Sequence, residues 1–226
     1  MITTGSATRN KIIHRIAVGS FFFLSGATFA SWASRIPTIK EMFSLNEAEL
    51  GSLLFLLPLG SLAVLPLAGW SISTFGSRLI TLLSALGYTA VLLSIAFSHS
   101  LLQLSVSLFF LGSCGNTLNI SMNTQALELQ EHIYRRPLMS SFHALWSFGA
   151  MFGALAGGWM MSAGVSMMMQ YLVISVLMWL VYFVSYNFLV HNSTVHARRK
   201  FVWPSRALWL LGIICLCCAI CEGAMA

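Results

Sequence analysis

Long apolar segments make up most of this chain, and short polar stretches between them hold most of the charged residues. A helix needs about 20 predominantly apolar residues to cross a bilayer. Lipid gives backbone amides no hydrogen-bond partner, so repeated apolar segments of this length are expected to be helices. The pattern predicts an all-α polytopic membrane protein, with spans over residues 12–34, 50–72, 79–97, 101–124, 138–163, 167–190 and 207–226.

The composition excludes a soluble protein. Only 8% of the residues are charged, and the mean hydropathy is +0.82. A soluble domain of this composition would expose large apolar patches to water. The polar stretches between the predicted spans are also too short to hold a soluble domain of their own.

The charges predict an orientation. If the N-terminus is cytoplasmic, only Arg35 and Lys40, of twelve Lys and Arg residues, lie outside. An excess of cations in short cytoplasmic loops is typical of membrane proteins. We therefore expect a multi-pass protein of the bacterial inner membrane with a cytoplasmic N-terminus. The net charge of +6 then indicates contact with the lipid bilayer, not with nucleic acid.

Three stretches indicate a family. Gly69, Gly76 and Arg78 match a loop signature of the major facilitator superfamily between its second and third helices, although Ser73 replaces the acidic residue. The sequences Trp-Ala-Ser-Arg-Ile-Pro at 32–37 and Arg-Pro-Leu-Met-Ser-Ser-Phe-His at 136–143 resemble a sugar-permease-like branch of that superfamily. The sequence Met-Asn-Thr-Gln-Ala at 122–126 is also similar to it.

This resemblance implies two six-helix bundles around a central solute path, of which the chain holds the N-terminal half. We expect a six-helix bundle over 1–190, a cytoplasmic linker over 191–206 and the start of a seventh helix over 207–226. The last predicted span stops at Ala226 without a polar tail. We therefore expect a truncated protein whose missing C-terminal bundle is its structural partner.

Three amides lie on one face of the fourth predicted helix. Asn116, Asn119 and Asn123 follow one another at spacings of three and four residues, which places them in one stripe. An amide both donates and accepts hydrogen bonds, as binding a polar solute requires. Hydrogen bonding between helices is the alternative, because small polar residues commonly supply it in membranes. The sequence leaves both interpretations open.

The fifth predicted helix carries a further candidate pair. His143 is expected near the cytoplasmic mouth of the path at a depth similar to that of Asn123, with Trp146 one turn deeper. A His could relay a proton, or it could be neutral and hydrogen-bonded. Trp146 could stack on a ring-shaped solute or simply pack. On another stripe, Gly149, Gly153 and Gly157 predict close approach of a neighbouring helix.

A gate is predicted at the outer surface. Glu222 is the only acidic residue within a predicted span, and Arg35 ends the first helix on the same side. Opposite charges at one depth could pair when the outer mouth is shut. The alternative is that Glu222 only reaches outer water.

Nothing in the sequence indicates an enzyme, a cofactor or a metal site. There is no Asp and no GxSxG or phosphate-binding loop motif. The membrane cysteines are expected to behave as small apolar residues: Cys114, Cys215, Cys217, Cys218 and Cys221. We predict a secondary transporter for a small, sugar-like polar solute that works by alternating access, with proton coupling open. The alternatives are a membrane sensor or assembly protein, and an intramembrane enzyme using His143.

Overall fold

The protein is all-α in the computed structural model, which describes residues 3–191, 205–207, 209–214 and 217. Within these residues there are helices and no strands, so the predicted fold class is confirmed. The chain divides into two units, Met1–Val195 and His196–Ala226. The described part of the second unit is helical over 206–207, 209–214 and 217. Glu222 and most of the predicted linker lie outside the described residues.

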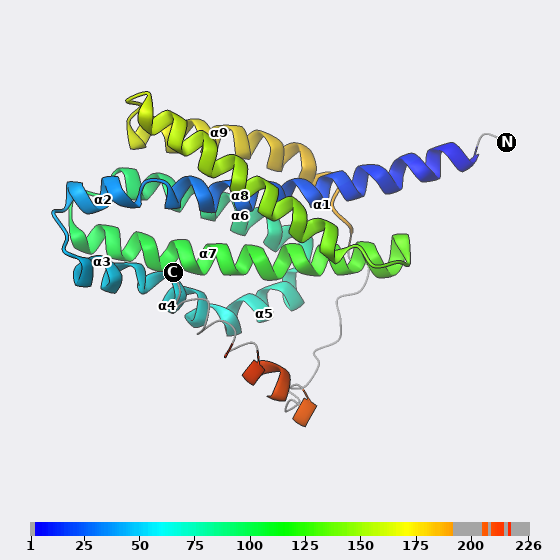
Figure 1. The fold of residues 1–226 in the computed structure, drawn as a ribbon. Helices are drawn as coiled ribbons and strands as arrows, with labels where there is room; N and C mark the ends of the chain where they lie inside the picture. Colours follow the sequence, from blue (N-terminus) through cyan, green and yellow to red (C-terminus); the bar gives the residue numbers. More distant parts are fainter. Residues whose placement is uncertain (1–2, 192–204, 208, 215–216, 218–226) are drawn as a thin grey trace. The chain divides into compact units, whose positions relative to one another are not determined.

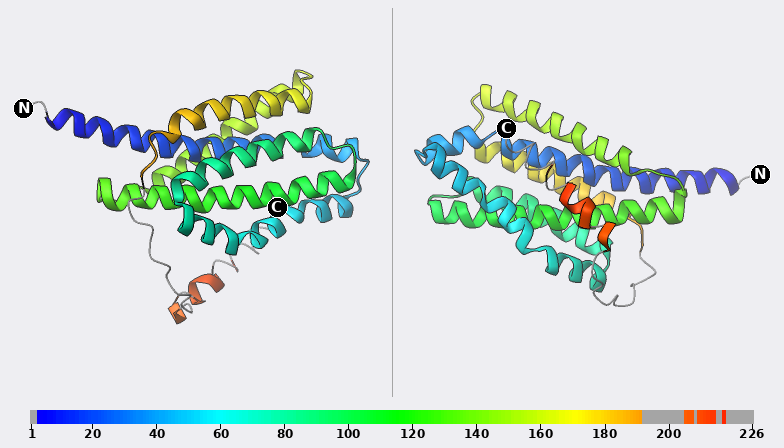
Figure 2. Two further views of the ribbon diagram at one scale, coloured as in Figure 1. Left: turned by 180° about the vertical axis from the view of Figure 1, so that it is seen from behind. Right: turned by 60° about the horizontal axis from the view of Figure 1, so that its bottom comes forward.

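The first unit contains all the labelled helices (Figures 1 and 2). Among the described residues, five helical segments are long and apolar enough to cross a membrane, and a bent pair makes a sixth if its two parts form one span. The bounds are α1 Thr3–Ala33, α2 Ile36–Met42, α3 Glu47–Leu54, α4 Leu56–Ala63, α5 Leu65–Phe75, α6 Ser77–Ala96, α7 Leu101–Glu128, the π-helix η1 Leu129–Tyr134, α8 Met139–Ser162 and α9 Met167–Tyr186.

The second predicted span is broken, which corrects the single segment expected over 50–72. It consists of α3, α4 and α5, and its two parts, Glu47–Ala63 and Leu65–Phe75, are bent by 42°. Pro58 and Pro66 explain the interruption, because proline has no backbone N–H and its ring clashes with the carbonyl four residues before it. The bend therefore follows from the sequence of this span.

The helices of the first unit pack in a few close pairs. α1 packs along α8, α6 along α7, and α4 against α7, while α9 lies against both α6 and α1 (Figures 1 and 2). Stacked aromatic rings fill the contact of α1 with α9 and α8. The ring centroids of Phe21 and Tyr182 are 4.8 Å apart, and those of Phe22 and Phe142 are 5.3 Å apart.

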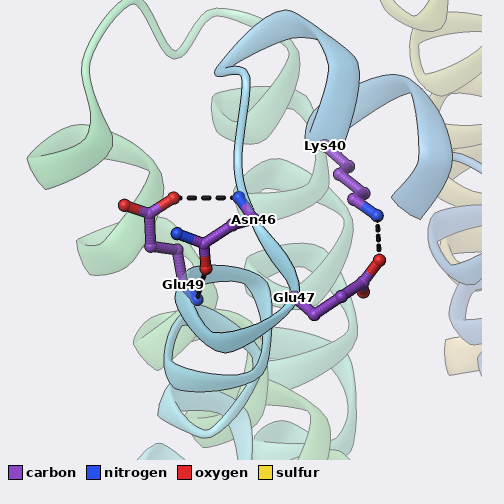
Figure 3. A network of polar contacts seen from close by, with 4 residues as sticks. All are labelled: Lys40, Asn46, Glu47 and Glu49. Carbon is purple, nitrogen blue, oxygen red and sulfur yellow. Dashed lines mark hydrogen bonds and ion pairs between the residues drawn. The ribbon is translucent and has the colours of Figure 1, made fainter.

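The turn between α2 and α3 is held by polar side chains (Figure 3). The Asn46 side chain accepts a hydrogen bond of 2.9 Å from the Glu49 backbone N–H, and the Glu49 carboxylate accepts one of 2.9 Å from the Asn46 N–H. This reciprocal pair satisfies two amides at the start of α3. Lys40 forms an ion pair with Glu47 across the same turn. These contacts therefore stabilise the turn at which the chain changes direction after the first span.

The described cations gather at two opposite ends of the first unit. The larger group of cations includes Arg15 and Arg78. Arg15 donates to Ser141, and Arg78 donates to the Tyr186 carbonyl, so these contacts join several helices at one end. Arg35 and Lys40 belong to the opposite end, with α2 and the start of α9. This separation agrees with alternating spans. Which end faces the cytoplasm stays a prediction.

Candidate functional site

A cavity of about 310 Å³ lies among five helices of the first unit. It collects residues from α1, α4, α6, α7 and α8, so it can form only when the bundle is assembled. Three residues selected from the sequence line it together: Asn116, Asn119 and Trp146. The other lining residues are Ser25, Phe29, Leu57, Pro58, Ser61, Tyr88, Leu111, Gly112, Gly115 and Met122.

The amide face of α7 bonds to a neighbouring helix and also borders the cavity. Asn116 donates a hydrogen bond of 2.7 Å to the Ser61 carbonyl of α4, which ties the two helices together. Asn119 is exposed, and its side-chain oxygen accepts a bond of 2.9 Å from Asn123. Asn123 is not among the cavity-lining residues. It orients Asn119, so Asn119 is the amide best placed for a solute.

Aromatic side chains form another part of the wall. The ring centroids of Trp146 and Phe29 are 6.2 Å apart, and Phe29 in turn lies 5.9 Å from Trp32. Phe29 is exposed and Trp146 is partly exposed, so both rings present surface to the cavity. Tyr88 is buried beside them and brings a phenol from α6. The site thus combines amides and hydroxyls with aromatic rings.

His143 lies apart from this cavity. Its side chain is exposed on α8, edge-on to Phe22 with ring centroids 5.7 Å apart. It is not among the residues that line the cavity, and within the described residues it makes no hydrogen bond to Asn123. The expected meeting of His143 and Asn123 is therefore not a hydrogen-bonded contact in this conformation.

Glycine pairs bring the cavity walls close together. A Cβ built at Gly112 of α7 would overlap the Leu57 carbonyl, and one at Gly60 of α4 would overlap the Phe109 carbonyl. The same reciprocal contact joins α1 and α8, where a Cβ at Gly26 would overlap the Trp146 carbonyl. Only glycine permits such close approach of two helices.

The predicted glycine stripe lies along α1. Gly149, Gly153 and Gly157 are all buried, and a Cβ at each would overlap atoms of α1 or of Ser34, the residue that follows it. The overlapped atoms are the Phe23 carbonyl oxygen at Gly149, the Ala27 carbonyl oxygen at Gly153 and the Ser34 hydroxyl at Gly157. The stripe therefore sets the separation of α1 and α8, and with it the position of Trp146.

Arg35 is buried at the end of the bundle opposite the cation-rich one, with 4% of its surface exposed. Its Nε donates to Gln170 Oε1 at 2.6 Å, and its Nη2 donates to the Val165 carbonyl at 2.6 Å. Gln170 in turn donates to Ser31 Oγ at 2.9 Å. The guanidinium thus joins the turn after α1 to the start of α9 and the turn before it. Its predicted pairing with Glu222 stays a prediction, since Glu222 lies outside the described residues.

Comparison with known proteins decides the family. The profile described as Major Facilitator Superfamily matches residues 17–225. The chain belongs to the Major Facilitator Superfamily.

Individual relatives agree with this assignment. An uncharacterized transporter of Sinorhizobium fredii is 29% identical over 210 residues, covering 91% of this chain and 55% of the relative. An uncharacterized MFS-type transporter of Yersinia pestis is 27% identical over 224 residues, or 97% of this chain and 57% of the relative. A cis,cis-muconate transport protein of Acinetobacter baylyi is 26% identical over 143 residues, or 61% and 33%. The chain thus spans about half the length of the first two relatives.

The superfamily loop signature covers the end of α5, the turn at Gly76 and the start of α6. Gly76 has a φ of +83°, a conformation that side chains rarely adopt, so the turn itself explains this glycine. A Cβ at Gly69 would meet nothing within 4 Å, so no neighbour in the described residues explains that glycine. Arg78 donates to the Tyr186 carbonyl at 3.0 Å and lies 4.4 Å from the centroid of its ring. It therefore anchors the loop to the end of α9.

A buried polar cluster beside this loop was missed from the sequence. α7 continues four residues past the predicted end at 124, so Glu128 lies within this helix. This corrects the expectation that Glu222 is the only acidic residue within a span. Gln125 is fully buried and donates to Ser77 Oγ at 2.5 Å and to the Val190 carbonyl at 3.1 Å. The three-residue spacing of Gln125 and Glu128 on one helix face was the available signal.

Two of the five cysteines lie among the described residues. Cys114 is half-buried and Cys217 is exposed, while Cys215, Cys218 and Cys221 lie outside the described residues. Within the described residues, no group of three or more His, Cys, Asp or Glu side chains is placed to hold a metal ion.

Proposed function

We propose that the complete protein is a secondary active transporter of the bacterial inner membrane for a small, uncharged, sugar-like solute. The cavity among α1, α4, α6, α7 and α8 is proposed as the part of the solute path that this half contributes. Alternating access would expose it to each side of the membrane in turn. Membership of the superfamily and the transporter names of its relatives support a transport function rather than enzymatic catalysis.

The chemistry of the cavity wall carries the choice of solute. None of the described residues that line it is a Lys, Arg, His, Asp or Glu. Amide and hydroxyl groups hydrogen-bond to uncharged polar groups, and aromatic rings pack on the apolar faces of ring-shaped solutes. An uncharged solute needs no buried counter-ion in such a site. Proton coupling stays a prediction, because no acid or histidine is among the described lining residues.

One relative suggests a different solute class. The Acinetobacter protein is named for cis,cis-muconate, which carries two carboxylates. A dianion would need cations in the site. Arg35 is the buried cation of the first span, and its described hydrogen bonds go to Gln170 and Val165. The described half therefore favours an uncharged solute.

Uptake into proteoliposomes made with the complete protein tests the function. We expect accumulation of neutral hexoses or polyols to exceed that of dicarboxylates. Asn119→Ala should lower uptake about two- to tenfold, as expected for one lost hydrogen bond. The matched control is Asn187→Ala at the end of α9, where the amide donates to the Phe183 carbonyl and, among the described residues, to no other group.

The possible outcomes separate the alternatives. Equal uptake per folded molecule by the Asn119→Ala variant and the wild type would show that the amide is structural. Faster uptake of dicarboxylates would overturn the solute class. No uptake of any solute would favour a sensor or assembly protein, and turnover of a solute without a gradient would favour an enzyme using His143.

A further inference from the structure

We propose that a groove beside the first turns of the α1 span binds one anionic phospholipid of the surrounding bilayer. The groove has a volume of about 790 Å³ and is lined by residues of α1, η1, α8 and α9 and by Arg136. α8 packs along α1, and α9 packs against α6 and α1, while α8 and α9 have little contact with each other, so a length of α1 is left uncovered between them. None of the lining residues belongs to the solute cavity.

Three cations stand at one end of this groove: Lys11, Arg15 and Arg136. The guanidinium carbons of Arg15 and Arg136 lie 6.0 and 5.4 Å from the centroid of the Tyr134 ring, so both arginines are gathered around one aromatic side chain. Among the described residues, none of the three cations is within ion-pair distance of a carboxylate. Their charge is therefore available to a phosphate group.

The rest of the groove is apolar. Ile12, Ile16, Phe23, Leu145 and Val181 form its walls. Leu145 packs closely over Gly19, because a Cβ at Gly19 would lie only 2.9 Å from the end of the Leu145 side chain. The α1 lining runs from Lys11 to Leu24, about 20 Å at 1.5 Å per residue. That length exceeds the roughly 15 Å of hydrocarbon in one leaflet, so the groove is long enough for one acyl chain.

The combination selects the ligand class. A soluble anion would use the cations and leave the apolar walls empty, while a neutral lipid would use the walls and leave the cations unpaired. A phospholipid with net negative charge fits both parts, with its headgroup at Lys11, Arg15 and Arg136 and an acyl chain along Ile16 and Phe23. The groove lies along the segment Asn10–Met42, which is apolar enough to cross the membrane. The proposed site thus lies along a candidate membrane span, as a lipid ligand requires.

Native mass spectrometry of the complete protein, stripped of lipid and titrated with phosphatidylglycerol or phosphatidylcholine, tests the proposal. We expect one phosphatidylglycerol to bind more tightly than phosphatidylcholine. Arg136→Gln and Lys11→Gln should each lower phosphatidylglycerol affinity about fivefold, the effect of one basic residue at an anionic membrane surface. Phosphatidylcholine binding should not change. The matched control is Arg135→Gln, because Arg135 is an exposed neighbouring arginine that does not line the groove.

A second variant tests the apolar part without changing charge. Leu145→Trp narrows the groove and should lower phosphatidylglycerol affinity about tenfold, because some methylene groups lose their burial. Unchanged affinity in this variant would overturn the proposal. It would also be overturned if Arg135→Gln weakened binding as much as Arg136→Gln, or if glycerol phosphate, which lacks acyl chains, competed as well as the lipid.

Discussion

Arg35 illustrates how a single residue shapes this bundle. Within the described residues its buried charge is met by the oxygens of Gln170 and Val165, not by a carboxylate. Side-chain and backbone carbonyl dipoles can stabilise a guanidinium, but each lost acceptor leaves a buried donor unpaired. Gln170 is fully buried and also bonds to Ser31, so it links α9 to α1 as well as to the charge of Arg35.

Replacing Gln170 should expose this dependence. Gln170→Leu removes the acceptor of Arg35 Nε, and we expect the free energy of unfolding in detergent to fall by about 1–3 kcal/mol. Gln170→Glu keeps an acceptor and adds an opposite charge, so it should retain more stability than the leucine variant. Thermal unfolding of both variants measures the difference. A leucine variant as stable as the wild type would mean that Arg35 finds another partner.

At the scale of elements, the α1–α8 crossing depends on glycine. Gly149→Ala would drive a Cβ into the Phe23 carbonyl, and the backbones would have to separate. Overpacking of this kind costs about 1–3 kcal/mol. We expect Gly149→Ala to lower the melting temperature clearly, while Gly158→Ala on the same helix has little effect, because its Cβ would meet nothing within 4 Å. Equal melting temperatures would show that α8 can shift without cost.

The sequence predicted elements better than their contacts. The apolar segments and the Gly149–Gly153–Gly157 repeat are local patterns, and they can be seen without knowing which helix lies opposite. Gly60 and Gly112 belong to no such repeat, although one closely faces the Phe109 carbonyl and the other the Leu57 carbonyl. Asn116 likewise donates to a backbone carbonyl, that of Ser61. Every residue has a backbone carbonyl, so the sequence does not indicate which one is the partner.

At the scale of the whole molecule, the arrangement of cations predicts the orientation in the membrane. The excess of Lys and Arg at one end should keep that end in the cytoplasm. In a variant with the native cysteines replaced, an impermeant thiol reagent added outside should label Ser44→Cys and miss His132→Cys. Both positions are exposed, and they lie in the turn between α2 and α3 and in η1. The reverse labelling pattern would contradict the proposed topology.

The two reciprocal glycine crossings have one further consequence, which concerns internal symmetry. Gly26 and Gly149 each face a carbonyl three residues before the other, and Gly112 and Gly60 do the same. α1 with α8 therefore corresponds to α7 with α4, as in a three-helix repeat. In this correspondence the places of Asn116 and Asn119 are taken on α1 by Ala30 and Ala33. The hydrogen-bonding wall thus departs from the repeat, so a solute in the cavity would be held in one orientation and not in two equivalent ones.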